Sequence, residues 1–159
     1  MKLTHSHIYE QHIDAIFQSC INQDFIKTKM AALGARNIEV NIGQNVDAVT
    51  IEIIRETPVD VPNAFKSFMK PWSKMTQTEV WKGTHGGPYH CNITIQVHGA
   101  PLNIQGQMKL GVIDEGTAVV SITEVTCSIP FIGKALTNFL GDISKKAIEK
   151  EFEYIGLNV

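Results

Sequence analysis

The residues best able to do acid–base chemistry are a carboxylate and an imidazole on neighbouring predicted strands. Glu79 lies in the segment MTQTEVW, where strand alternation puts it on one face with Met75 and Trp81, and His90 begins the next strand. A carboxyl or imidazole group held in an apolar interior has a shifted pKa and can act as a general acid or base. Glu79 and His90 are therefore the candidate catalytic pair, although the sequence favours the simpler interpretation that Glu79 is solvated on the exposed face.

The histidines are the only residues whose spacing suggests a metal site. His5 and His7 lie two apart on a predicted strand and point to one face, and His12 follows soon after. No cysteine or carboxylate stands at a ligand-like spacing beside them, and the same is true of His85 and His90. We therefore expect no metal and no other cofactor.

Three cysteines, Cys20, Cys91 and Cys127, are too few and too widely spaced for a disulfide framework or a thiolate zinc site. We expect all three to be reduced, small core residues.

Composition limits the classes of partner. The chain has 159 residues, of which 43% are hydrophobic and 19% charged, as in an ordinary globular protein, so we expect one domain over residues 1–159. The net charge of −2, with no basic stripe, argues against nucleic acid as a binding partner. The start lacks a signal-peptide pattern and no apolar run is long enough to span a membrane, so we expect a cytoplasmic protein. The sequence identifies no protein partner.

The elements that must position these residues follow from hydrophobic periodicity. A short strand, Lys2 to Tyr9, is followed by a helical pattern that a turn at Asn22–Asp24 divides into two short helices. Six strands follow, joined by tight turns. The chain ends with a long amphipathic helix, from about Phe131 to Tyr154, whose apolar face must pack against another apolar surface. The predicted fold is therefore α+β, with the last helix lying across a curved, seven-stranded antiparallel sheet.

This order of elements, with the segments IIRETPVDVPNAFKSFM, VHGAPLNIQGQMKL and VTCSIPFIGKAL, resembles the START-like (SRPBCC, helix-grip) superfamily. Within it, the chain is similar to a small bacterial family of unknown function. The most family-like parts are the Ile129–Gly133 approach to the last helix and the run of Arg55, Glu56, Pro58, Pro62 and Phe65. The resemblance implies a sheet that grips the C-terminal helix and a cavity between them for lipids, sterols, polyketides or other apolar molecules. It carries over no catalytic residues.

Large apolar side chains are the candidate lining of such a cavity. They cluster in the loop and strand after Pro62, on the middle strands and along the last helix, although each could equally belong to a packed core. The predicted ligand-binding residues are Phe65, Phe68, Met69, Trp72, Met75, Trp81, Ile93, Met108, Phe131, Leu136, Phe139 and Ile143.

The function expected from these observations is binding of a hydrophobic or amphipathic small molecule between sheet and C-terminal helix. Two alternatives stay open. One is an enzyme of the polyketide cyclase or dehydratase kind that uses the same cavity, with Glu79 or His90 as acid or base. The other is a co-chaperone-like module that binds a protein partner through a strand edge or the outer face of the helix.

Overall fold

The computed structural model describes residues 1–159 and contains a seven-stranded sheet with three α-helices and one 3₁₀ turn. In chain order the elements are β1 (Lys2–Tyr9), α1 (Ile13–Cys20), α2 (Gln23–Ala32), β2 (Arg36–Gln44), β3 (Val49–Pro58), η1 (Asn63–Phe65), β4 (Trp72–Gly83), β5 (Tyr89–Val97), β6 (Leu102–Ile113), β7 (Gly116–Cys127) and α3 (Gly133–Asn158). The predicted order of one strand, two helices, six strands and a final helix is confirmed.

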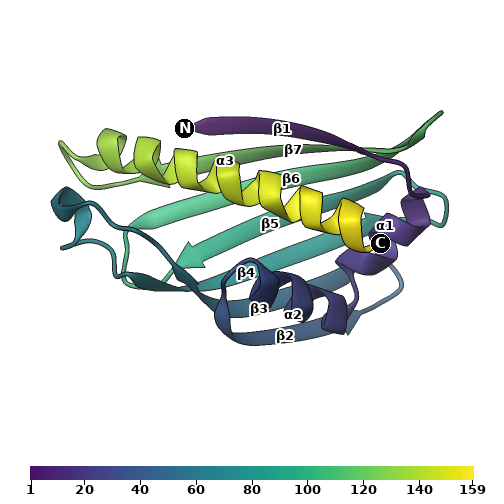
Figure 1. The fold of residues 1–159 in the computed structure, drawn as a ribbon, viewed down its shortest axis with the longest axis horizontal. Helices are drawn as coiled ribbons and strands as arrows, with labels where there is room; N and C mark the ends of the chain where they lie inside the picture. The colour runs from purple at the N-terminus through teal and green to yellow at the C-terminus, as the bar shows by residue number, and fades with distance from the viewer.

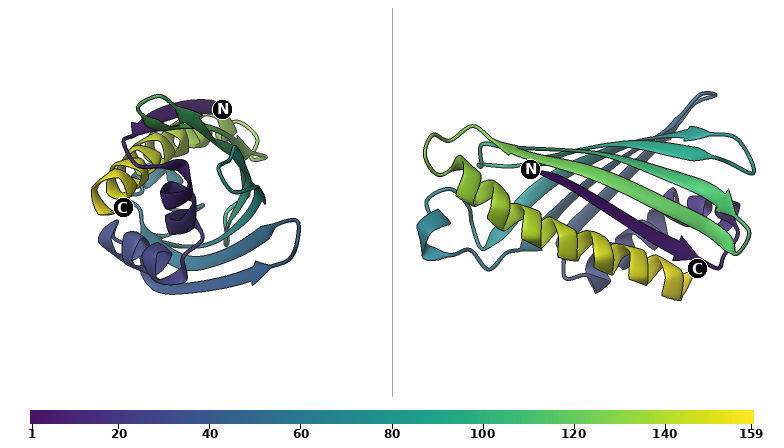
Figure 2. Two further views of the ribbon diagram at one scale, coloured as in Figure 1. Left: turned by 90° about the vertical axis from the view of Figure 1, so that its right-hand side faces the viewer. Right: turned by 90° about the horizontal axis from the view of Figure 1, so that it is seen from above.

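The sheet is antiparallel throughout, in the order β1-β7-β6-β5-β4-β3-β2. The sheet is strongly curved, and α3 lies across its concave face, as the view along the strands in Figure 2 shows. Helix α3 packs mainly on β1 and β7 and reaches α2 at its C-terminal half (Figure 1). The α+β helix-grip fold is therefore confirmed. None of the helices is long and apolar enough to cross a lipid bilayer.

The two short helices are separate because each has its own N-cap. The His12 side chain accepts a hydrogen bond from the Asp14 amide at 3.2 Å, and Asn22 Oδ1 accepts one from the Phe25 amide at 2.8 Å. Side-chain acceptors of this kind satisfy amides that have no partner inside the helix. The predicted division at Asn22 is thus confirmed.

The bounds of α3 differ from the prediction. The helix begins at Gly133 because Phe131, with φ of 67°, is outside the right-handed helical region, and it continues past Tyr154 to Asn158. Its most buried side chains, Leu136 and Phe152, face the sheet.

The hydrophobic core consists of two clusters instead of one. The first surrounds α1, α2 and the C-terminal half of α3, and includes Ile16, Trp81 and Phe152. The second lies at the other end of the sheet, around η1 and the N-terminal half of α3, and includes Met69 and Leu136. Most domains have one contiguous core, so the region between the two clusters is the place to look for a site.

Candidate functional site

Charged and polar side chains occupy the concave face of two adjacent strands. On β3, Arg55 continues the inward alternation of Ile51 and Ile53, and all three are buried. On β4, Gln77 and Glu79 stand opposite Ile53 and Ile51 in the antiparallel register. The concave face therefore carries a polar strip on β3 and β4 beside its apolar residues.

Glu79 is held by two hydrogen-bond donors from its own strand. Gln77 Nε2 donates to Glu79 Oε1 at 2.5 Å, and the Trp81 indole donates to Oε2 at 2.8 Å. The two donors are the residues two positions before and after Glu79, so they lie on the same face of β4. The prediction that Glu79 shares a face with Trp81 is confirmed, and the interpretation of Glu79 as a solvated residue on the outer face is wrong.

An ion pair joins the two helices above this carboxylate. Lys29 Nζ on α2 donates to Glu151 Oε2 on α3 at 3.0 Å, and the Lys29 and Glu151 side chains are only 10% and 27% exposed. Burial lowers the pKa of Lys29, but the nearby Glu151 carboxylate, together with Cys20 and Glu79, outweighs burial and leaves that pKa raised. Burial likewise raises the pKa of Glu151, but Lys29 and Arg55 outweigh it and leave that pKa lowered. Both groups are therefore charged at neutral pH.

Arg55 is the buried cation without a hydrogen-bond partner. The residue is 8% exposed, and its Nη1 is buried with no acceptor in reach. Burial lowers the pKa of its guanidinium, and the charges of Glu151 and Glu79 act in the opposite direction. Two residues further along the same face of β3, the buried hydroxyl of Thr57 also has no partner.

The neighbouring acid of Arg55 faces the other way. Glu56 lies on the outer side of β3, where its Oε2 accepts hydrogen bonds from Arg36 Nε at 2.7 Å and from Asn37 at 3.0 Å. The hydrogen bond from Arg36 lowers the pKa of Glu56 below its usual value. The family-like Arg55–Glu56 pair is thus divided, with Glu56 joining β2 to β3 and Arg55 turned into the interior.

Apolar side chains on the concave face remain partly open to water. Met75, Ile93, Ile95 and Met108 alternate with outward-facing polar residues on β4, β5 and β6, yet each is only half-buried although α3 lies over this face. Gly106 lies on the same face. The three atoms nearest to a Cβ at this position would all belong to the sheet, and none to α3. The space between the middle of the sheet and α3 is therefore incompletely filled.

Most of the predicted ligand-binding residues lie on the inner side. Phe65, Phe68, Met69, Leu136, Phe139 and Ile143 belong to the second cluster or pack against it, with the rings of Phe65 and Phe139 5.5 Å apart. Trp81 is a buried member of the first cluster, and Ile93 and Met108 pack against it. Whether these residues contact a ligand stays a prediction.

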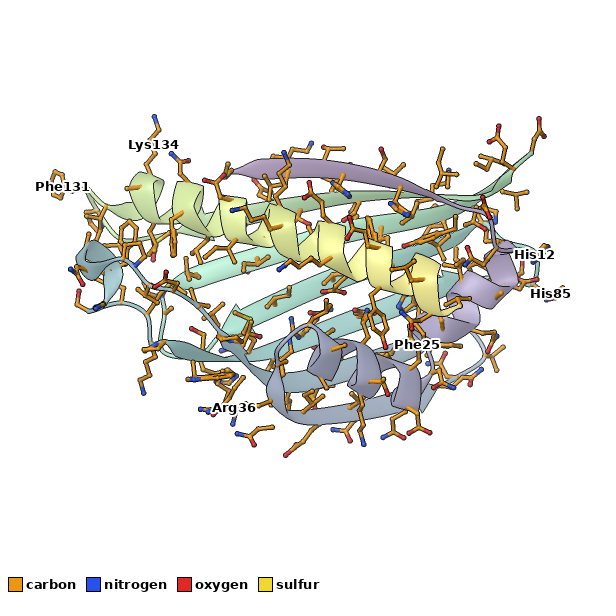
Figure 3. All side chains as sticks on the ribbon, in the orientation of Figure 1. His12, Phe25, Arg36, His85, Phe131 and Lys134 are labelled. Atoms are coloured by element: carbon orange, nitrogen blue, oxygen red, sulfur yellow. The ribbon has the colours of Figure 1, made fainter.

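Two of the predicted residues are not in the interior. Trp72 lies on the outer face of β4, opposite in alternation to Met75, and the Arg36 guanidinium covers its ring at 3.7 Å. Phe131 is fully exposed and projects from the end of the molecule before α3 begins (Figure 3). The prediction that Trp72 and Phe131 line the space between sheet and helix is wrong.

The predicted pairing of Glu79 with His90 is also wrong. His90 is exposed and stands opposite Lys82 and Lys109, on the outer face, whereas Glu79 stands opposite Ile93 on the inner face. The two side chains are therefore on opposite sides of the sheet.

The N-terminal histidines, His5 and His7, are half-buried on the edge strand β1, beneath α3. His5 Nδ1 is 3.9 Å from Glu149 Oε1, and the rings of His5 and Phe152 are 5.4 Å apart. His7 packs against Tyr9, with ring centroids 4.7 Å apart. No group of three or more histidine, cysteine, aspartate or glutamate side chains comes close enough to hold a metal ion.

Three further polar groups border the first cluster. Tyr9 is buried with its hydroxyl unpartnered, and burial raises its pKa. Cys20 and Cys91 are free thiols, as predicted, and burial raises the pKa of Cys20 to about 12. Thiols of this kind are un-ionised at neutral pH and are poor nucleophiles. They add no covalent chemistry to the site.

Two open hollows on the surface lie away from these residues. One is at the C-terminal end of α3, beside Phe25 and Tyr154, and the other is at the turn between β5 and β6. Neither contains Arg55 or Glu79. The candidate site is therefore the polar concave strip of Arg55, Gln77 and Glu79 together with the half-buried apolar residues around it.

The sheet order and the helix across its concave face define a helix-grip protein with a START-like fold. The chain belongs to the family described as "Protein of unknown function (DUF2505)", whose model matches residues 4–156. No curated protein matches the sequence.

Solved structures with the same fold cover nearly the whole chain at low sequence identity. TTHA0849 from Thermus thermophilus has a TM-score of 0.67 at 10% identity and covers 98% of this chain and 94% of its own. A conserved protein from Geobacillus kaustophilus has a TM-score of 0.60 at 14% identity, with 98% and 93% covered. Ara h 8.0201 has a TM-score of 0.59 at 14% identity, with 99% of both chains covered. At these identities the likeness establishes the fold and no more.

Proposed function

We propose that the protein binds an apolar or amphipathic small molecule, of the size of a lipid, sterol or polyketide, between the concave face of the sheet and α3. The observation that carries the proposal is the partial exposure of Met75, Ile93 and Met108 on a face that a helix covers. Packed interiors leave few voids, so apolar side chains that water reaches beneath a helix favour a space meant for another molecule. Removing their surface from water would contribute about 25 cal/mol per Å².

The site has two parts with different chemistry. Phe65, Phe139 and Ile143 offer an apolar lining near η1, and Arg55 and Glu79 offer polar groups further along the face. Small-molecule sites typically combine an apolar lining with a few polar groups that orient the ligand. This division supports an amphipathic ligand with its apolar part toward η1.

An enzymatic function is the second candidate, because a carboxylate faces the same space. Glu79 is positioned by Gln77 and Trp81 and could act on a bound molecule as a general base. A carboxylate fixed by two donors is oriented for such a role.

Native mass spectrometry of protein purified without detergent tests the proposal. We expect a fraction of the protein to carry an additional, lipid-like mass that organic extraction removes. Titration of the stripped protein with N-phenylnaphthylamine, a neutral apolar fluorophore, should then give saturable binding that the extracted material reverses. A chain mass without additions, together with no binding of the fluorophore, would reject the proposal.

A further inference from the structure

We infer that the bound molecule carries an uncharged oxygen acceptor, such as a ketone, ester or hydroxyl oxygen, that receives a hydrogen bond from the buried guanidinium of Arg55. The inference rests on the proposed function, since it names the chemistry of the molecule held in the same space. It starts from Arg55, a buried charged side chain whose Nη1 has no hydrogen-bond partner.

The need for an acceptor follows from the burial of the donor. A guanidinium has five N–H donors and no acceptor. Leaving a buried donor unpaired is costly, and more so when the group is charged. Arg55 is more than nine-tenths buried, and its Nη1 has no partner, whereas the other inward-facing cation, Lys29, is paired with Glu151. Arg55 is therefore the group that a ligand would satisfy.

A second unpartnered group lies next to it. The Thr57 hydroxyl is on the same face of β3, two residues along, and is also buried without a partner. Residues two apart on a strand are roughly 7 Å apart, so a head group of a few atoms can reach both. A hydroxyl can donate or accept, which suits a ligand oxygen bonded to Arg55.

The charge balance of the interior favours a neutral head group over an anion. The charged side chains that face this region are Lys29 and Arg55 against Glu79 and Glu151, two of each sign. Both carboxylates lie near enough to affect the pKa of Arg55, although neither forms a direct ion pair with it. An added anion would leave one uncompensated negative charge in a region of low dielectric, which is strongly unfavourable. A neutral oxygen satisfies the guanidinium without that penalty.

A pair of ligands with equal chain length separates the two kinds of head group. Methyl octyl ketone offers an uncharged acceptor, and decanoate offers an anion. Each would be titrated against N-phenylnaphthylamine bound to the stripped protein at neutral pH. We expect the ketone to displace the fluorophore at a lower concentration than decanoate. Tighter binding of decanoate would overturn the inference, and this comparison uses the parent protein, so it does not depend on the folding of a variant.

The variant Arg55→Met then tests the residue itself. We expect ketone affinity to fall about tenfold to a hundredfold, as for loss of a hydrogen bond to a charged group, with affinity for the fluorophore unchanged. Arg36→Met is the matched control, because Arg36 is the only other arginine and lies outside, on Trp72. It should leave both affinities as in the parent.

Other results have distinct meanings. Unchanged ketone affinity in Arg55→Met would show that Arg55 is satisfied by water and would overturn the inference while leaving the proposed function standing. An equal loss of affinity for ketone and fluorophore would mean that the substitution damages the site as a whole, which also counts against a specific role. Failure of the parent to bind any of the three compounds would reject the proposed function itself.

Discussion

Lys29 on α2 and Glu151 on α3 form an ion pair, with Nζ and Oε2 3.0 Å apart, above the concave face of the sheet. The pair connects the two helices that border the space between the clusters of the core. Glu151 also interrupts the amphipathic pattern of α3, because this charged residue lies on the side of the helix that carries the apolar residues.

Removing either member of this pair should destabilise the protein more than breaking an exposed ion pair would. Lys29→Met leaves the Glu151 carboxylate without its main cation, and we expect a loss of about 3 kcal/mol in the free energy of unfolding, the low end for buried pairs. Because the two residues interact directly, Lys29→Met combined with Glu151→Met should cost less than the sum of the single variants by about 1–3 kcal/mol. Urea denaturation of the four proteins measures this, and strict additivity would contradict the pairing.

The same pair should give the stability a specific dependence on acid. The pKa of Glu151 is lowered in the folded state, so its ionised form stabilises the fold above the unfolded pKa of about 4.3, and this contribution is lost as the pH falls through the lower folded value. Glu151→Gln lacks the contribution at every pH. The difference in unfolding free energy between parent and variant should therefore be largest above about pH 5 and shrink below it. A difference that stays constant down to acid pH would contradict the assignment.

Two residues on one face of α3 should respond differently to truncation. Leu136 is fully buried, so Leu136→Ala should cost about 2–5 kcal/mol. Phe139 is half-buried beside Phe65, and Phe139→Ala enlarges a space that already exists, so its cost should fall near or below the low end of the roughly 3–5 kcal/mol typical of buried phenylalanine. Binding of N-phenylnaphthylamine should change in Phe139→Ala. A full-size loss of stability, with a parent that binds no fluorophore, would favour a solid core.

The two tryptophans should report differently on a ligand. Trp81 is buried and hydrogen-bonded to Glu79, whereas Trp72 lies on the outer face beneath Arg36. In Trp72→Phe, the remaining Trp81 emission should change when methyl octyl ketone binds. In Trp81→Phe, the remaining Trp72 emission should not. A response confined to Trp72 would place the ligand on the wrong side of the sheet.

The fold was predictable because periodicity and turn residues agree along the whole chain. Strand alternation also placed Glu79 on one face with Trp81, although the charge of Glu79 favoured the exposed face, and alternation could have excluded Trp72, which is out of phase with Met75. His90 begins its strand, but its alternation with the buried Tyr89 and Cys91 places it on the outer face. For Phe131 the cause of the wrong prediction is a local backbone conformation that the sequence does not reveal.

The charged residues of the interior were missed for a different reason. Arg55 continues the alternation of Ile51 and Ile53, and Glu151 lies between Ile148 and Ile155 at helical spacing, so both positions could have been assigned to the interior. Charge argued against burial, because arginine and glutamate are rarely buried unless paired. Only the tertiary arrangement of α2, β3 and α3 brings them together, and no local pattern predicts it.

The central claim, that a small molecule occupies the space beneath α3, is tested most directly by filling that space. Ile93 is half-buried on the inner face of β5, and its neighbour Thr94 is exposed on the outer face. Ile93→Trp and Thr94→Trp add the same side chain on opposite sides of the strand. Titration of both with N-phenylnaphthylamine should show binding at least tenfold weaker than the parent in Ile93→Trp, with denaturant stability largely retained, and unchanged binding in Thr94→Trp. Binding that is equal in the parent and both variants would contradict the claim.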